Sequence, residues 1–193
     1  MAAEGYESTG RTSQKQRTRD LLVRTVRDLI GQGRDPTVDE VAAASGVSRT
    51  TTYRYFPSQQ AMVLAAFPET EGVAFGPSVT DVRERLATAL EHQFRVLREW
   101  EPQLRAALRA SLAPAAGGRL LRGGRAIGWF EDALAPIGAT HDVHALAISL
   151  RAVAGIEPYV WLTDVAGQSP DAAVATMRRT AMTLLDAALA ANP

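Results

Sequence analysis

Residues 37–56 carry the pattern of two short helices joined by a tight turn, and no other segment constrains the fold as much. Thr37 and Glu40 have the spacing of a capping box, in which each side chain covers a backbone N–H of the other. Gly46 stands where the chain must reverse, a position that often needs a positive φ. Ser48 can then cap the second helix. The pattern predicts a helix-turn-helix.

The outer surface of the second helix carries side chains that are poorly suited to a hydrophobic core. Its hydroxyl groups, its arginine and its two tyrosines suit a groove edged with phosphates and base acceptors. We therefore expect double-stranded DNA as its partner, and the alternative is a helical hairpin that never meets DNA. The side chains concerned are Arg49, Thr50, Thr51, Tyr53 and Tyr55.

Composition predicts an all-α fold. The chain has 193 residues, 46% hydrophobic and 22% charged, which is ordinary for a globular protein. Alternating β-branched residues are nearly absent. The lack of cysteine excludes disulfides, thiolate metal sites and a cysteine nucleophile. No basic segment followed by an apolar one opens the sequence, and we find no apolar run that approaches a membrane span, so we expect a cytoplasmic protein without a membrane partner.

The formal net charge is zero, but its distribution favours the N-terminal part as a DNA-binding region. Residues 1–67 hold nine basic and seven acidic side chains. Between Arg11 and Arg19, four basic residues occur without an acid. This cluster either touches DNA or belongs to a solvated arm.

Helix patterns and breakers divide the chain into four regions. We expect a flexible arm over residues 1–16, a helix-turn-helix domain over 17–67, a linker over 68–77 and a helical bundle over 78–193. Helices are expected at about residues 17–30, 59–67, 81–100, 102–112, 125–134, 141–165 and from residue 170 onward.

The last two helices are expected to form a homodimer. Ser169 and Pro170 predict the start of the final helix, as N-cap and first helical residue. Dimers place two recognition helices about 34 Å apart, one turn of DNA; the alternative is that both helices complete the core of one subunit. The apolar stripes are Val143, Leu146, Leu150, Val153 and Val160, then Val174, Met177, Ala181, Leu184 and Ala188.

Residues 37–62 resemble the TetR family of bacterial transcriptional regulators. The shared pattern consists of Thr37, Val41-Ala42, Ser45-Gly46-Val47-Ser48 and Tyr53-Arg54-Tyr55-Phe56. The resemblance implies an N-terminal three-helix helix-turn-helix domain followed by a C-terminal helical bundle that dimerises and binds a small-molecule effector. It also implies a repressor that the effector releases from a palindromic operator.

The resemblance assigns DNA-binding roles to particular positions. Thr37 would bind a phosphate at a helix N-terminus. Arg49, Thr50 and Thr51 would form the base-reading turn, in which arginine can bind guanine O6 and N7. The DNA backbone or thymine methyl groups would be contacted by Ser48, Tyr53 and Tyr55. Ser58 is the last residue of the expected DNA-binding set.

Three residues depart from the family pattern. Gln59 stands where many members have a phosphate-binding lysine. Thr52 replaces an apolar core residue, so the recognition helix is expected to pack less firmly. Thr50 replaces a small residue or proline, so the base-reading turn is bulkier.

Aromatic residues of the C-terminal region are candidates for an effector site. We expect Phe94, Trp100, Trp129 and Tyr159 to line it, since ligand pockets in helical bundles are mostly apolar, and the alternative is that they form plain core. Glu157-Pro158 is expected to interrupt the penultimate helix.

No cofactor, metal ion or catalytic residue is expected. His141 and His144 lie one helical turn apart, but no third ligand accompanies them. Only three histidines are present, and no glycine-rich phosphate loop follows a strand. The alternatives to a regulator are an all-helical small-molecule-binding protein or enzyme without DNA activity, and a structural helical protein.

Overall fold

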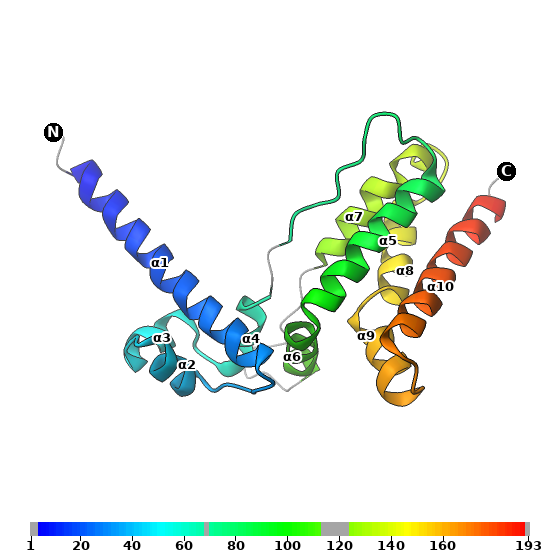
Figure 1. The fold of residues 1–193 in the computed structure, drawn as a ribbon. Coiled ribbons are helices and arrows are strands. Elements are labelled where there is room, and N and C mark those ends of the chain that lie inside the picture. Colours follow the sequence, from blue (N-terminus) through cyan, green and yellow to red (C-terminus); the bar gives the residue numbers. More distant parts are fainter. Residues whose placement is uncertain (1–3, 68–69, 113–123, 192–193) are drawn as a thin grey trace. The chain divides into compact units, whose positions relative to one another are not determined.

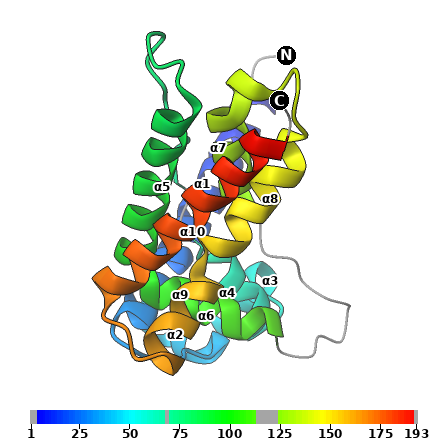
Figure 2. The same ribbon diagram turned by 90° about the vertical axis from the view of Figure 1, so that its right-hand side faces the viewer.

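The computed structural model describes residues 4–67, 70–112 and 124–191, and within these ranges the chain forms helices and no strand (Figures 1 and 2). The predicted all-α class is therefore confirmed. The helices separate into two compact units, which we describe one at a time.

In its described residues, unit 1 contains five helices around one hydrophobic core. They are α1 (Glu4–Gly31), α2 (Val38–Ser45), α3 (Arg49–Tyr55), α4 (Gln59–Ala65) and α6 (Glu101–Leu112). The core is formed by apolar side chains at helical spacing on each element. It includes Leu22, Val26, Leu29, Ile30, Val38, Val41, Phe56, Met62, Val63 and Ala106.

Helix α1 corrects the predicted flexible arm. The helix begins at Glu4, so the arm prediction is wrong for residues 4–16, while residues 1–3 lie outside the described part. No proline interrupts residues 4–31, and side chains support the added turns: Gln16 Nε2 donates to Asp20 Oδ1 over 2.8 Å.

Helix α6 makes unit 1 discontinuous in sequence, which differs from the predicted single bundle over 78–193. The Gln103 amide donates from Nε2 to the carbonyl of Arg27 over 3.0 Å, and the Gln60 amide donates to the carbonyl of Ala110 over 2.5 Å. Ala106 lies in the same core as the helix-turn-helix. Both apolar and polar contacts therefore attach α6 to α1 and α4.

Unit 2 is built from α5 (Val82–Glu99), α7 (Arg125–Leu134), α8 (Val143–Val153), α9 (Ile156–Val160) and α10 (Pro170–Ala191), with the short segments η1 (Ala135–Ile137) and η2 (Trp161–Val165). The helices predicted at 81–100, 125–134 and from 170 onward are found within one residue of these bounds. Ser169 Oγ accepts from the N–H of Ala172 at 3.3 Å, as expected of an N-cap.

Three ion pairs join α5 and α10 along their length. Arg83 meets Asp186 at 2.9 Å, Glu91 meets Arg178 at 2.7 Å, and Arg98 meets Asp171 at 2.6 Å. Residues later in α5 pair with residues earlier in α10, so the two helices run antiparallel in one fixed register.

The interruption expected at Glu157-Pro158 in the helix over 141–165 is found, and the break lies a few residues before Pro158. A proline has no N–H and its ring clashes with the carbonyl four residues back, which here belongs to Ala154. The chain leaves the helix at Ala154 and Gly155 and resumes at Ile156. Pro158 then falls in the first turn of α9, where no backbone donor is required.

Residues 143–165 are also long and apolar enough to cross a membrane, so the expectation that no run approaches such a span is wrong by this criterion. The run is broken at Gly155 and contains the ion pair of Arg151 with Glu157 at 3.2 Å. Its buried residues, among them Ala147, Leu150 and Tyr159, pack within unit 2. One side of the segment thus contributes to the core of unit 2, while Ile148 and Trp161 remain exposed.

Candidate nucleic-acid interface

The caps predicted for α2 and α3 are all present. Thr37 Oγ1 accepts from the N–H of Glu40 at 3.2 Å, and Glu40 Oε2 accepts from the N–H of Thr37 at 2.8 Å, which completes the capping box. Gly46 follows α2 with φ of 70°, a conformation in which a side chain is disfavoured. Ser48 Oγ accepts from the N–H of Thr51 at 3.3 Å. These local signals fix the angle at which α3 leaves the turn.

Helix α3 buries one side and exposes the other. Thr52 is fully buried and Phe56, just after the helix, is 3% exposed. Thr52 Oγ1 donates to the carbonyl of Ser48 over 3.1 Å, so its buried hydroxyl is satisfied. The opposite side presents Arg49, Thr50, Tyr53 and Arg54 to solvent, with Thr51 and Tyr55 half-buried. The surface predicted from the sequence is therefore the outer face of this helix.

Several expected DNA-binding side chains already bond to other parts of unit 1. The Thr37 hydroxyl donates to Glu40 Oε2 over 2.9 Å, and the Ser48 hydroxyl donates to Thr51 Oγ1 over 2.9 Å. Ser58 caps α4, with its Oγ accepting from the N–H of Ala61 at 3.1 Å. Besides any contact with DNA, these hydroxyls hold the helix N-termini in place.

Two side chains of α3 make contacts that the sequence did not suggest. The Arg49 guanidinium donates from Nε and Nη2 to the two carboxylate oxygens of Asp39, over 2.8 and 2.6 Å. Tyr55 donates from its hydroxyl to the carbonyl of Lys15 over 3.0 Å. Tyr53, by contrast, is 44% exposed. The partners of Arg49 and Tyr55 lie on α2 and α1, too far away in sequence for local reasoning to find them.

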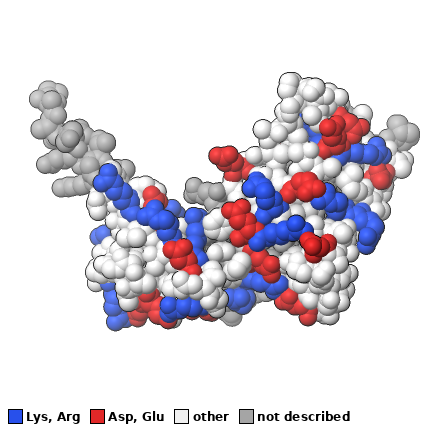
Figure 3. All heavy atoms as spheres, in the orientation of Figure 1, with Lys and Arg blue, Asp and Glu red and all other residues white. Residues whose placement is uncertain are grey.

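A groove of about 510 Å³ lies between α1 and α3. Lys15 and Arg54 bring two positive charges to it, and the Arg54 guanidinium lies 6.0 Å from the ring of Tyr55. On the molecular face seen in Figure 3, basic and acidic side chains are interspersed rather than separated. The groove is thus a local basic site, and its lining is Gln14, Lys15, Thr18, Thr51, Arg54 and Tyr55.

Glu40 is electrostatically tied to the start of α2. The backbone N–H of Thr37 lowers the pKa of Glu40 below its usual 4.5, and the Thr37 hydroxyl and the Arg34 guanidinium, 2.8 Å away, act in the same direction. The carboxylate is therefore ionised at neutral pH. It complements the positive end of the helix dipole at the position where a phosphate was expected.

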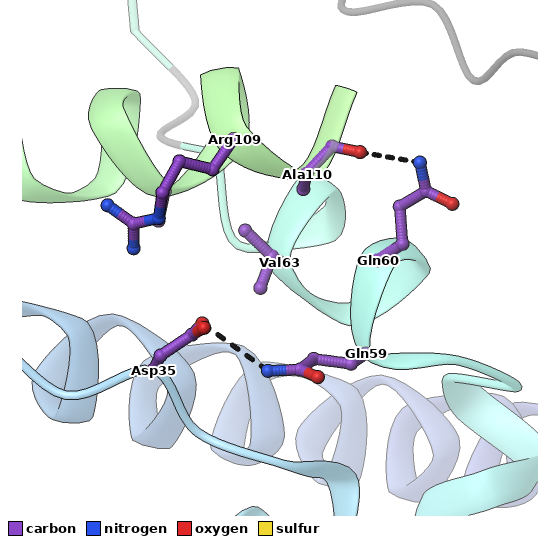
Figure 4. Close-up of a pocket in the computed structure, with 7 residues that line it drawn as sticks. Asp35, Gln59, Gln60, Val63, Arg109 and Ala110 are labelled. Atoms are coloured by element: carbon purple, nitrogen blue, oxygen red, sulfur yellow. Dashed lines mark hydrogen bonds between the residues drawn. The ribbon is translucent and has the colours of Figure 1, made fainter. Parts of the chain in front are cut away.

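A second cavity in unit 1, of about 270 Å³, lies beside α4 and α6 (Figure 4). Gln59 points toward Asp35, and its Nε2 donates to the carboxylate over 3.3 Å. Arg109 extends from α6 on the other side of the cavity. Gln59, which replaces a lysine of the family pattern, thus bonds within its own unit.

The expected effector residues lie in unit 2, mostly in its core. Phe94, Trp129 and Tyr159 are at most 7% exposed, and Trp100 is half-buried at the end of α5. Tyr159 donates from its hydroxyl to Glu101 over 3.0 Å. The cavity of about 500 Å³ bounded by Phe75, Arg85 and Pro136 is lined by none of these four aromatic residues.

The histidine pair considered for metal binding has other partners. His141 Nδ1 lies 2.7 Å from the hydroxyl of Thr140, and His144 Nδ1 lies 2.5 Å from Glu131. Across residues 4–67, 70–112 and 124–191, no group of three or more His, Asp or Glu side chains is placed to hold a metal ion.

Comparison with known proteins agrees with the geometry of unit 1. Residues 21–66 match the model of bacterial regulatory proteins of the tetR family. Uncharacterized HTH-type transcriptional regulators of Mycobacterium bovis and of two Mycobacterium tuberculosis strains are 43% identical over 72 residues. The aligned part spans only 36% of this chain and 36% of each relative. No solved structure matches the chain. The helix-turn-helix region of this chain is therefore that of bacterial regulatory proteins of the tetR family.

Proposed function

We propose that the protein is a cytoplasmic, ligand-responsive transcriptional regulator that binds DNA sequence-specifically as a repressor. The observation that supports this best is the outer face of α3. Its buried side is fixed by Thr52 and Phe56, so the exposed Arg49, Thr50 and Tyr53 project from a rigid base. A preorganised helix of this kind fits the major groove, with the residues of its N-terminal turn nearest the base edges.

We propose a homodimer that forms through the last two helices and recognises a palindromic operator. Unit 2 exposes Ile148 on α8, by 45%, and Trp161 in the segment that follows α9, by 58%. Side chains of this size in water favour burial against a partner. Helix α10 presents small exposed residues, Ala172, Ala175 and Ala187, which allow close approach of a second helix.

The proposed effector is a small molecule that enters unit 2 among Phe94, Trp100, Trp129 and Tyr159. Because three of these side chains are buried, the ligand must displace core contacts when it binds. The Tyr159 hydroxyl bonds to Glu101, the first residue of α6, at the sequence junction between the units. The coupling between effector and DNA binding that release requires is about 1–3 kcal/mol.

A salt series with random-sequence duplex tests the proposal. Binding of a regulator weakens steeply as salt rises, because phosphate contacts release counterions. Selection from random or genomic duplexes should then return a site with twofold symmetry, and sedimentation should give twice the subunit mass. A monomer that binds no duplex even in dilute buffer would contradict the proposal and favour a helical ligand-binding protein or enzyme without DNA activity.

A further inference from the structure

Asp39 and Arg49 form a fork between the two helices of the motif. Asp39 lies in the first turn of α2 and Arg49 is the first residue of α3. Two hydrogen bonds of 2.8 and 2.6 Å join one edge of the guanidinium to both carboxylate oxygens. The Arg49 side chain is 71% exposed, so without this fork it would sample many directions. Two parallel bonds to a planar group fix both its position and its plane.

The fork leaves a second edge of the guanidinium open. Arginine carries five N–H donors, and the bonds to Asp39 use one on Nε and one on Nη2. The outward edge still has parallel N–H groups on Nη1 and Nη2. Guanine presents two acceptors side by side in the major groove, O6 and N7, whereas adenine presents one acceptor and one donor. The two parallel N–H groups of the free edge match the two acceptors of guanine better than the pattern of any other base.

We propose that Asp39 is a specificity-determining residue that positions Arg49 to bind guanine. This inference rests on the proposed function and deepens it, since it names the base that α3 prefers at one position of each half-site. Asp39 touches Arg49 rather than the base, so its effect is on the direction of the arginine.

Removal of the carboxylate has a second consequence. Arg49 is a cation on a flexible stem, and once released it can reach a backbone phosphate, which every sequence offers. Asp39 prevents this by neutralising the arginine and holding it. Its loss therefore increases nonspecific binding while it decreases discrimination between bases.

Four variants test whether Asp39 positions Arg49 and Arg49 binds guanine. They are Asp39→Asn, Arg49→Ala, the double variant and the control Asp28→Asn. Asp28 is exposed on α1 and its carboxylate has no partner among the described residues, so the control matches the change in net charge. Each protein is presented with the selected duplex and with duplexes carrying every base pair at each half-site position, at several salt concentrations.

We expect Arg49→Ala to reduce the preference for guanine at one position by about 5- to 150-fold, and Asp39→Asn to reduce it at the same position. Asp39→Asn should also bind random duplex more tightly and with a steeper salt dependence, and the double variant should discriminate no less than Arg49→Ala. Asp28→Asn should keep the wild-type preference.

Two results overturn the inference while the proposed function stands. In one, Asp39→Asn retains the full preference at the position that Arg49→Ala affects. In the other, Arg49→Ala lowers affinity equally for all duplexes. Absence of duplex binding by the wild-type protein would instead overturn the proposed function itself, and this inference with it.

Discussion

The hydroxyl of Tyr55 donates a 3.0 Å hydrogen bond to the backbone carbonyl of Lys15. The residues are forty positions apart, and the bond joins the end of α3 to the part of α1 that precedes the core. Tyr55 thus links the recognition helix α3 directly to α1, across the basic groove that both helices line.

Tyr55→Phe should lower the free energy of unfolding by about 0.5–1 kcal/mol, because the ring remains while one hydrogen bond is lost. Amide exchange around residues 14–19 should become faster. Tyr53→Phe is the matched control, since the Tyr53 hydroxyl has no hydrogen-bond partner in the described part of the chain. Equal unfolding free energies of the two variants would show that the hydrogen bond to Lys15 does not contribute to stability.

Tyr53→Ala should weaken binding to the selected duplex roughly tenfold, about 1.4 kcal/mol. The side chain is 44% exposed, so its removal should leave helicity and mass in solution unchanged. Fluorescence anisotropy with labelled duplex measures the affinity, and circular dichroism checks the fold. Thr88→Ala, an exposed change on α5, serves as control. Undiminished affinity of the Tyr53 variant would remove this residue from the interface.

Thr37→Ala should destabilise the protein by about 1 kcal/mol, and Thr37→Ser should restore most of the loss, because serine retains the capping oxygen. The cap is also pH-dependent. The lowered pKa of Glu40 means that the folded state favours the carboxylate, so this stabilisation is present above pH 4.5 and is lost as pH falls through the lower folded pKa. Urea titrations across this range should show a smaller pH effect in Glu40→Gln.

Thr52→Val should leave stability unchanged or raise it by up to about 1 kcal/mol, since a buried methyl replaces a buried hydroxyl of the same shape. The carbonyl of Ser48 keeps its other donor, the N–H of Thr52 at 2.9 Å. Thr52→Ala should be destabilising because it leaves a cavity. Thermal melts of the two variants measure this, and a large loss in Thr52→Val would mean that the hydroxyl itself fixes α3.

Folding of unit 2 should depend on His92 in mildly acidic solution. Burial, with a smaller contribution from Arg95, lowers the pKa of His92 below 6.5, against an opposing hydrogen bond with the backbone of Glu71. The unfolded chain therefore binds the proton more readily. Stability from the neutral ring is full above about pH 6.5 and declines as pH falls toward the folded pKa.

His92→Phe keeps an aromatic ring beside Trp129, whose centroid is 4.6 Å away, but cannot titrate. Its unfolding free energy should vary less with pH between about 5 and 6.5 than that of the wild type. Ser149→Ala, an exposed and non-titrating change elsewhere in unit 2, should keep the wild-type slope. An unchanged slope in His92→Phe would assign the pH effect to other groups.

Local chemistry accounts for what the sequence predicted well. The capping box at Thr37, the positive φ of Gly46 and the N-cap at Ser169 each depend on neighbours within a few residues, so short patterns suffice. The outer face of α3 was predicted from the polar side chains of its sequence, and Arg49, Thr50 and Tyr53 are exposed there, while Thr51 and Tyr55 are half-buried.

Contacts between residues distant in sequence account for what the sequence did not predict. The apolar residues of α6, such as Leu104 and Ala106, fit any helical core equally well, so their pattern does not reveal that they join unit 1. The fork of Asp39 with Arg49 spans ten residues and a turn. Local reasoning gave Arg49 a free guanidinium, whereas one edge of it is already bonded.

Because α6 belongs to unit 1, it affects how an isolated DNA-binding fragment could be made. A fragment that stops after α4 would lack Ala106 and the amide of Gln103, which bonds to the carbonyl of Arg27. Apolar surface of Val63, which lies beside Ala106, would then be more exposed to water. A minimal DNA-reading fragment therefore cannot be obtained by truncation at the first linker; it has to be supplied with α6 as well, by fusion or as a separate peptide.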